Sequence, residues 1–170
     1  MASFSERIIR AAKLDVKVYE EIEADKEAFA QAIMVVVLSS IAAGIGSLSK
    51  EGLGGLFIVT IGALLGWFFW AYLTYLIGTK ILPEAQTQAD YGQLLRTIGF
   101  SSSPGLIRIL GIIPFLKEII FMVATLWMLV AMIIAVRQAL DYTSTLRAVI
   151  VCVIGWVFQV VIFSLLFAIL

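Results

Sequence analysis

The residues whose types could best carry out chemistry lie in one stretch of the sequence, RTIGFSSSPGLIRILGIIP, residues 96–114. A serine hydroxyl becomes a nucleophile when a general base lies beside it and a tight turn presents its oxygen. The string GFSSSPG lacks the second glycine of a Gly-x-Ser-x-Gly turn, and the chain contains no histidine to act as the base. The sequence also has no phosphate-binding glycine loop and no pair of carboxylates inside an apolar run. We therefore expect no catalytic residues and predict that the protein is not an enzyme.

The sequence offers few ligands for a metal ion or a cofactor. Histidine, the commonest metal ligand, is absent. The only cysteine, Cys152, lies inside an apolar run, so the chain has neither a thiol pair for a metal nor a disulfide. We expect no metal site, no cofactor and no nucleic-acid partner.

The same stretch also interrupts a membrane segment. Arg108 divides it, and its longest uncharged piece, residues 97–107, has 11 residues, which is too short to cross a bilayer. Pro104 cannot donate a backbone hydrogen bond and disfavours helical geometry at Ser103, while Gly105 frees the backbone. These residues predict a helix break near Ser103. The predicted polar break comprises Arg96, Ser101, Ser102, Ser103, Pro104, Gly105, Arg108 and Pro114.

The polar side chains of the break have two interpretations. In lipid each freed backbone group needs a partner, and Ser101, Ser102 and Ser103 can bond to nearby backbone or to a neighbouring helix. Arg108 is then expected to reach toward the headgroups or to face the bundle interior, and Pro114 closes the hinge. In the second interpretation the break forms a transport site, where Arg108 contacts a lipid phosphate or an anionic solute.

The elements that hold this stretch are those of an integral membrane protein. Of the 170 residues, 62% are hydrophobic and 14% are charged, and the mean hydropathy is +1.05. A soluble fold of this size cannot cover that much apolar surface. Four runs reach the roughly 18 uncharged residues that cross a hydrocarbon core. They are residues 28–49, 53–79, 119–136 and 148–170, and the broken segment 94–116 makes the count four or five.

Charge asymmetry places the N-terminus in the cytoplasm. If the broken segment crosses, nine Lys and Arg residues lie in cytoplasmic segments and only Lys50 and Lys117 lie outside. If it does not cross, nine lie inside and three outside. Because cytoplasmic segments carry an excess of Lys and Arg, both counts put the N-terminus inside.

An amphipathic helix is predicted ahead of the first span, over residues 3–23. Apolar side chains recur there at helical spacing, and the half up to Tyr19 carries four basic residues against two acidic ones. This basic half either lies on anionic headgroups or packs on the underside of the bundle. The chain is therefore divided into a cytoplasmic amphipathic N-terminal helix, residues 1–27, and a transmembrane helical domain, residues 28–170.

Glycines predict where the first two spans meet. Gly62 and Gly66, in GALLG, have the small-xxx-small spacing that lets a second helix backbone come close. The spacing recurs in the first run, where Gly44 and Gly46 each end such a motif. We therefore expect the first and second spans to pack on these four glycines.

Several strings of the sequence resemble one family of membrane proteins. They are QAIMVVVLSSIAAGIG at 31–46, GWFFWAYLTYLIGT at 66–79, YGQLLRTIGFSSSPGLIRIL at 91–110, IP at 113–114 and LWMLVAMIIAVRQALDYTSTLRAVIVCVIGW at 126–156. Together they resemble the prokaryotic branch of the Yip family, whose eukaryotic members were named as Ypt/Rab interactors. The resemblance covers nearly the whole chain.

The resemblance implies an all-α, five-span membrane bundle with a broken third segment. It also implies a cytoplasmic N-terminus and an extracytoplasmic C-terminus, in the cytoplasmic (inner) membrane of a prokaryote. Eukaryotic relatives take part in vesicle traffic and membrane shaping through Rab GTPases, and they carry a DLYGP-type motif. This sequence lacks that motif, so Rab binding is not expected to carry over.

The expected function is that of a non-enzymatic membrane scaffold. Such a protein associates through its helices with lipids, with itself or with another membrane protein. The alternative is a small transporter, channel or lipid-moving protein that uses the broken third segment. The two differ in whether the polar break contacts a ligand or only supports the fold.

Overall fold

The computed structural model describes the backbone of residues 2–47, 52–113 and 115–169, and their side chains except those of 52–55 and 162–169. Within these ranges the chain forms helices and no strands, so the predicted all-helical class is confirmed. The α-helices are α1 (Phe4–Ala12), α2 (Val16–Ala24), α3 (Ala28–Ser47), α4 (Gly52–Leu76), α5 (Tyr91–Phe100), α6 (Lys117–Ala139) and α7 (Thr145–Ile169). A π-helical turn, η1 (Ile77–Ile81), extends α4, and a 3-10 helix, η2 (Ser103–Ile112), follows α5.

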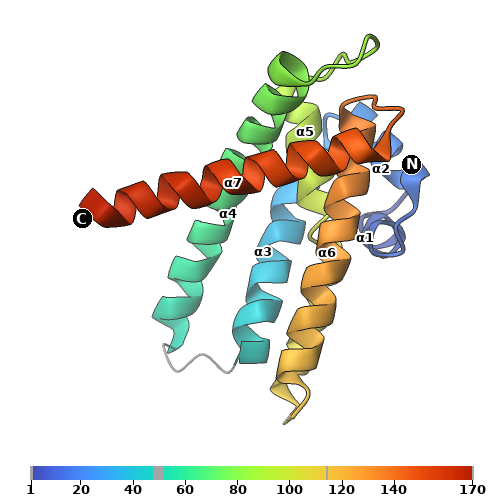
Figure 1. Cartoon of the computed structure of the whole chain (residues 1–170). Coiled ribbons are helices and arrows are strands. Elements are labelled where there is room, and N and C mark those ends of the chain that lie inside the picture. Colours follow the sequence, from blue (N-terminus) through green and yellow to red (C-terminus); the bar gives the residue numbers. More distant parts are fainter. Residues whose placement is uncertain (1, 48–51, 114, 170) are drawn as a thin grey trace.

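Three of these helices are long and apolar enough to cross a membrane. They are Ala28–Ser47, Leu56–Ile81 and Lys117–Ala139, with 20, 26 and 23 residues. They correspond to α3, α4 with η1, and α6, and they run side by side along the long axis of the molecule (Figure 1). Residues 145–161 of α7 form a shorter apolar helix. The protein is therefore an integral membrane protein built on a helical bundle.

The segment between α4 and α6 changes helix type part way along. α5 begins under a capping box of Asp90 and Gln93 and ends at Phe100, and η2 begins at Ser103 with Pro104 in its first turn. At about 1.5 Å per residue in α5 and about 2.0 Å in η2, the two pieces together measure about 35 Å. This interrupted segment therefore has the length of a full crossing, and it packs against α3 and α6.

The N-terminal segment forms two short helices in place of the single helix predicted over residues 3–23. Between α1 and α2, Leu14 adopts a left-handed backbone conformation with a φ of 62°. The Asp15 side chain then accepts a hydrogen bond of 3.0 Å from Lys17 N. Because an aspartate N-cap starts a new helix there, the expected single helix becomes a pair with a turn.

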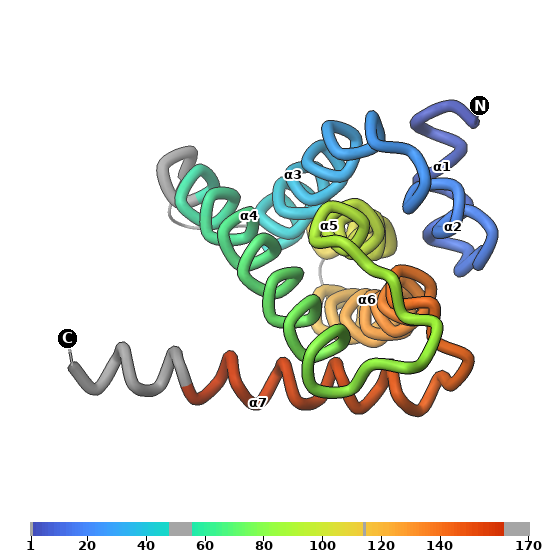
Figure 2. The backbone as a smooth tube through the Cα atoms, turned by 90° about the horizontal axis from the view of Figure 1, so that it is seen from above, coloured from blue at the N-terminus to red at the C-terminus, as the bar shows by residue number. Residues whose placement is uncertain are grey.

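This N-terminal pair shares its core with the rest of the bundle. Val18, Tyr19 and Ile22 of α2 are fully buried, and α2 packs against α5 and α6. α1 packs on η2, and the ring of Phe4 lies edge-on to that of Phe100 with the centroids 6.5 Å apart. Figure 2 shows both helices at the rim of the molecule, beside α3, α5 and α6.

α7 differs from the other long helices in direction. It crosses α4 and α6 near one end of the bundle instead of running along them (Figures 1 and 2). Ala148 and Val151 at its beginning are buried, whereas Trp156 and Val157 are exposed. Four segments, namely α3, α4, α5 with η2, and α6, thus run along the bundle, and the predicted fifth crossing lies across them in this arrangement.

Candidate functional site

Hydroxyl groups satisfy the backbone around the helix break. Ser101 Oγ and Ser103 Oγ each donate, at 2.7 Å, to the carbonyl of the residue three positions earlier. The amide of Gly105 donates to the Ser102 carbonyl at 2.9 Å. Carbonyls that a continuing α-helix would have used therefore have partners, as a break inside a bilayer requires.

The break is also enclosed by its neighbours. Ser101, Ser103 and Pro104 are buried. Gly105 lies so close to α3 that an added Cβ would collide with the Oγ of Ser39. α1 lies on one side of the break and α3 and α6 lie on others, so these helices shield much of its backbone from acyl chains, and the remaining side faces a cavity. Pro114, the last member of the predicted set, lies outside the described residues.

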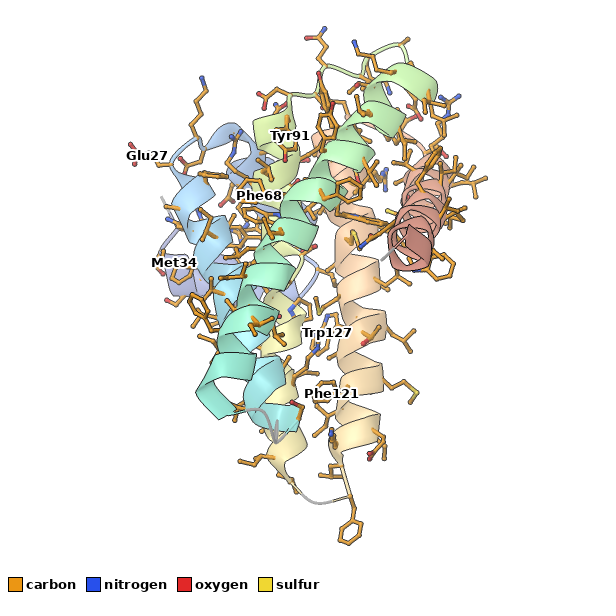
Figure 3. All side chains as sticks on the ribbon, turned by 90° about the vertical axis from the view of Figure 1, so that its left-hand side faces the viewer. Glu27, Met34, Phe68, Tyr91, Phe121 and Trp127 are labelled. Carbon is orange, nitrogen blue, oxygen red and sulfur yellow. The ribbon has the colours of Figure 1, made fainter. Side chains whose placement is uncertain are left out.

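Arg108 extends from η2 to the middle of α6. Its Nη2 donates to Met128 Sδ at 2.8 Å, and its Cζ lies 5.9 Å from the centroid of the Phe121 ring. Figure 3 shows Phe121 lying between α6 and the rest of the bundle. The Nε of Arg108 is buried and has no hydrogen-bond partner in the part of the chain that the structure describes. A thioether is a weak acceptor and a ring face compensates only part of a charge, so this cation lacks a full counter-charge.

A cavity of about 770 Å³ lies beside Arg108, and most of its lining is apolar. Its walls come from α3, α4, the break, α6 and α7. Its polar lining residues are Ser39, Ser40, Ser101, Ser102, Arg108, Thr125 and Gln159. Trp70 also lines it, and the indole Nε1 of Trp70 is buried without a partner among the described residues. An apolar cavity with a few polar groups and one cation is suited to an amphipathic anion.

Arg96 lies away from the break, although the sequence grouped it with that site. It is buried in α5, where its Nε donates to the carbonyl of Ile22 at 3.2 Å and its Nη2 donates to that of Glu23. These carbonyls belong to the end of α2, which carries the negative pole of the helix dipole. Arg96 therefore fastens the N-terminal pair to α5 and takes no part in the polar break.

The carboxyl group of Glu23 is half-buried beside this contact. Gln93 Nε2 donates to its Oε1 at 3.0 Å. Burial, together with the nearby carboxylate of Asp141, raises the pKa of Glu23 from 4.5 to about 7, although the Arg96 charge opposes the rise. The charge at the junction of α2 and α5 therefore changes near neutral pH.

Two arginines of the N-terminal pair form ion pairs with carboxylates of the same chain. Arg7 is 3% exposed and forms an ion pair with Asp25 at 2.7 Å. This guanidinium holds the pKa of the Asp25 carboxyl below its ordinary value. Arg10 pairs with Asp15 at 2.7 Å and with Glu21 at 2.9 Å. Guanidinium groups engaged in this way are not available to anionic headgroups.

Four exposed residues of the N-terminal pair are aliphatic or basic, namely Ile9, Lys13, Val16 and Lys17, and we call them the outer strip. Exposed Glu6, Glu20 and Glu21 lie on the same two helices. On the inner side, Trp127 Nε1 of α6 donates to the Ala12 carbonyl at 2.7 Å. The N-terminal pair packs on the bundle, and contact of its two exposed lysines with anionic headgroups stays a prediction.

The four predicted packing glycines have different surroundings. A Cβ on Gly46 would collide with a backbone carbonyl of η2, and one on Gly44 would collide with a side chain of α4. A Cβ on Gly62 or Gly66 would meet no described atom within 4 Å. The prediction that the first two spans pack on all four is therefore wrong for Gly62 and Gly66, because α3 turns its glycines toward η2 and the start of α4. Gly66 instead lines the cavity.

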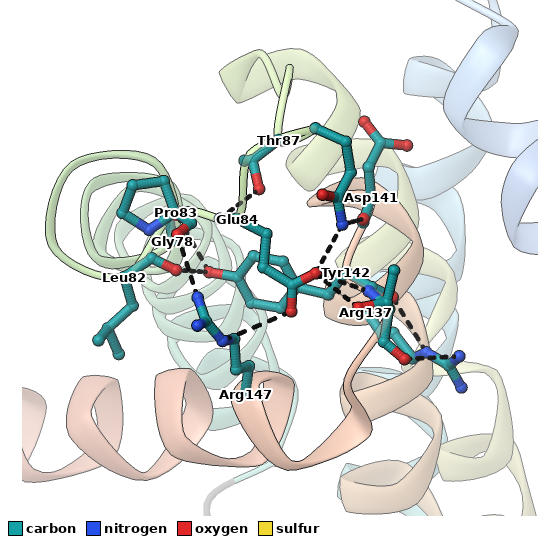
Figure 4. Close-up of polar contacts among 11 residues, drawn as sticks. Gly78, Leu82, Pro83, Glu84, Thr87, Arg137, Asp141, Tyr142 and Arg147 are labelled. Carbon is teal, nitrogen blue, oxygen red and sulfur yellow. Dashed lines mark hydrogen bonds and ion pairs between the residues drawn. The ribbon is translucent and has the colours of Figure 1, made fainter.

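A second polar cluster was not predicted. It joins the loop after η1 to the turn between α6 and α7 (Figure 4). Glu84 accepts hydrogen bonds from the amide of Thr143 at 3.0 Å and from its hydroxyl at 2.8 Å, and it pairs with Arg147 at 3.5 Å. The Thr143 amide lowers the pKa of the Glu84 carboxyl. The hydroxyl of Tyr142 lies 2.7 and 3.0 Å from two carbonyls within residues 78–82.

The sequence contained one signal for this cluster. EAQTQADY at 84–91 and RQALDYTSTLR at 137–147 are both polar loops between apolar runs. Loops separated by an even number of crossings lie at the same end of a bundle, so their approach follows from the topology. Which groups pair across them is a property of the tertiary fold.

Comparison with known proteins identifies the family. A family model described as the Yip1 domain matches residues 16–167. The match includes the interrupted segment, the cavity and the second polar cluster. No curated protein and no solved structure matches the chain. Because the family model covers most of its length, the chain belongs to the Yip family of membrane proteins.

Proposed function

We propose that this protein is a non-enzymatic membrane scaffold that associates with lipids, with itself or with another membrane protein. Its polar contacts support this function, since those of Arg7, Arg96 and Glu84 each join two separate parts of the chain. Contacts of this kind make a rigid body and leave the apolar faces of the helices for lipid or for a partner. Binding of a Rab-type GTPase forms no part of the proposal.

The observation that carries the proposal is the outer strip on a folded N-terminal pair. The strip cannot swing freely, because Arg96 and Trp127 attach its helices to α5 and α6. Lysines attract anionic headgroups, and the aliphatic residues between them enter the boundary between headgroups and acyl chains. A rigid strip that inserts among headgroups pushes lipids apart in one leaflet, and the scaffold thereby favours curved membrane.

The proposed topology has five spans in the cytoplasmic membrane, with residues 1–27 in the cytoplasm and 28–170 forming the transmembrane part. The last apolar run supports this, because residues 148–170 carry no charge and no polar face, and a helix lying along the surface needs one. To span, α7 turns from the direction of Figure 1 into line with α6. A C-terminal reporter that is active only outside the cytoplasm is expected to be active. Activity of a reporter confined to the cytoplasm would contradict five spans.

Sorting between membranes of different curvature tests the scaffold function. Full-length protein reconstituted with vesicles of mixed size is expected to concentrate in the smaller ones. The variant with Ile9→Ser, Lys13→Gln, Val16→Ser and Lys17→Gln is expected to lose about half of that preference or more, because the outer strip then neither attracts nor inserts. Equal sorting of the native protein into large and small vesicles would reject the proposal.

A matched variant controls for the loss of charge. Lys26→Gln combined with Lys80→Gln removes two exposed cations outside the strip. It is expected to sort like the native protein. If it loses the preference as well, net charge and not the strip is responsible.

The cavity beside Arg108 favours a second function, the movement of a lipid or an anionic solute. Liposomes with fluorescent lipid and anion-flux reporters test it, with Arg108→Ala and Ser101/Ser102/Ser103→Ala as the variants. Flux that the native protein supports and the folded variants lose would support movement. Absence of flux with the native protein would reject it.

A further inference from the structure

We propose that the cavity beside Arg108 binds an anionic phospholipid, with the phosphate on the Arg108 guanidinium and an acyl chain along the apolar wall. This site is separate from the outer strip, so the proposal does not depend on membrane curvature. It names the ligand of the second candidate function, and binding is measured apart from movement.

The Arg108 guanidinium lies deep between the helices. α6 runs from Lys117 to Ala139, so Met128, which the guanidinium contacts, is its middle residue. The Nε of Arg108 is buried, and Trp127, the neighbour of Met128, contacts α1, so the guanidinium lies inside the bundle at the level of α1. A cation enclosed in this way is costly unless an anion or several acceptors compensate it.

The described part of the chain provides no such compensation. No described carboxylate lies within 4.0 Å of Arg108, and the Nε is buried without an acceptor. The thioether of Met128 and the ring of Phe121 are its only polar or polarisable contacts among the described residues. A phosphate offers paired oxygens that match the fork of a guanidinium, so it supplies the acceptors that this arginine lacks.

The remaining lining distinguishes a lipid from a free phosphate. Trp70 Nε1 is a second buried donor without a partner in the described ranges, and Ser39 and Ser102 add hydroxyl groups. Most of the other wall is apolar, and its residues on α4 and α6, which keep their places when α7 turns to span, include Ala63, Trp67, Leu129, Met132 and Ile133. An inorganic anion would leave this wall without a contact, whereas an acyl chain covers it.

The chemistry of the lining also selects the headgroup. A zwitterionic headgroup brings a positively charged ammonium group, which needs a counter-charge of its own once it leaves water. Among the described residues, none that lines the cavity is Asp or Glu. Phosphatidylglycerol, whose headgroup is anionic, is therefore the expected ligand in preference to phosphatidylcholine.

Native mass spectrometry of the full chain in detergent tests the proposal. Titration with phosphatidylglycerol is expected to give retained adducts at about one tenth of the concentration that phosphatidylcholine requires, and inorganic phosphate none. Arg108→Met is expected to weaken phosphatidylglycerol binding about tenfold. The matched control Lys117→Met removes a cation from the exposed start of α6 and is expected to change binding less than about twofold.

A second pair of variants keeps the arginine in place. Gly66→Leu adds a side chain to the cavity wall, whereas Gly62→Leu adds the same side chain where no described atom lies nearby and outside the cavity. Both remove a glycine from the interior of α4, so their effects on helix stability are alike. Gly66→Leu is expected to weaken lipid binding and Gly62→Leu to preserve it.

Three results would overturn the proposal. They are equal affinity for the two lipids, retention of inorganic phosphate as strongly as lipid, and undiminished lipid binding in folded Arg108→Met. Should Arg108→Met fail to fold, unchanged binding in Gly66→Leu would overturn it alone. Lipid binding without flux would support the proposal and reject movement.

Discussion

Arg96 and Arg108 occupy the same interrupted segment, yet their surroundings are opposite. Arg96 lies on α5 and donates to two backbone carbonyls at the end of α2. Arg108 lies on η2, contacts a thioether and an aromatic ring, and has a buried Nε without an acceptor among the described residues. A buried arginine whose donors reach carbonyls is part of the fold. At Arg108, which lacks them, we propose that a ligand supplies the missing oxygens.

The largest effect is expected at Arg96. Arg96→Met removes charge-assisted hydrogen bonds to Ile22 and Glu23 and leaves their carbonyls buried without partners, so the free energy of unfolding is expected to fall by about 3 kcal/mol. Reversible unfolding of the full chain in mixed detergent micelles measures this. A loss below about 1 kcal/mol would mean that the contact with α2 is not structural.

The backbone contact between α3 and η2 comes next. Gly46→Ala forces a Cβ against the Arg108 carbonyl and is expected to cost about 2 kcal/mol, since backbone on both sides must move. Gly62→Ala is the control, because its Cβ meets open space and alanine favours a helix by up to about 1 kcal/mol. Equal effects of the two substitutions would show that η2 does not rest on α3.

The junction held by Arg96 is also expected to respond to pH. The pKa of Glu23 is about 7 in the fold and 4.5 ordinarily, so the folded protein retains a proton that the unfolded chain releases. Stability from this group therefore falls as pH rises from about 4.5 to about 7, and the loss is complete above that. Above about pH 8, Glu23→Gln is expected to be more stable than the native protein by about 1 kcal/mol, a figure reduced because the side chain is half-exposed. Near about pH 4.5 the two proteins are expected to have similar stability. A difference in the free energy of unfolding between the two proteins that does not change with pH would contradict this.

The smallest effect on stability is expected at Arg108. Arg108→Met places an apolar side chain beside Met128, and replacement of a partly buried charge that lacks a counter-charge is often neutral or stabilising. In lipid-free detergent the free energy of unfolding is expected to stay within about 1 kcal/mol of the native value. A loss as large as that of Arg96→Met would remove the difference between the two arginines and make Arg108 a structural residue.

Local features of the sequence predicted the helix break correctly. Pro104 and Gly105 restrict or free their own backbone, so the α-helix stops before Ser103 whatever surrounds it. The turn at Leu14 was missed although Asp15, which caps α2, was a local signal for it, because apolar residues recur at helical spacing on both sides of the turn. The packing predicted at Gly62 and Gly66 is not observed for a related reason. Small residues permit a close helix contact, but only the partner's position decides whether one forms.

By itself, the sequence determined that this protein is a helical membrane protein with one interrupted segment, because hydrocarbon forces every backbone group to find a partner nearby. Only the tertiary structure decided which polar residues are satisfied. The carbonyls that engage Arg96 lie 74 and 73 positions away, and the contact of Arg108 with α6 lies 20 positions away. Hydrogen bonds over such separations exist only once the helices have packed, and that packing leaves one arginine satisfied and the other open to a ligand.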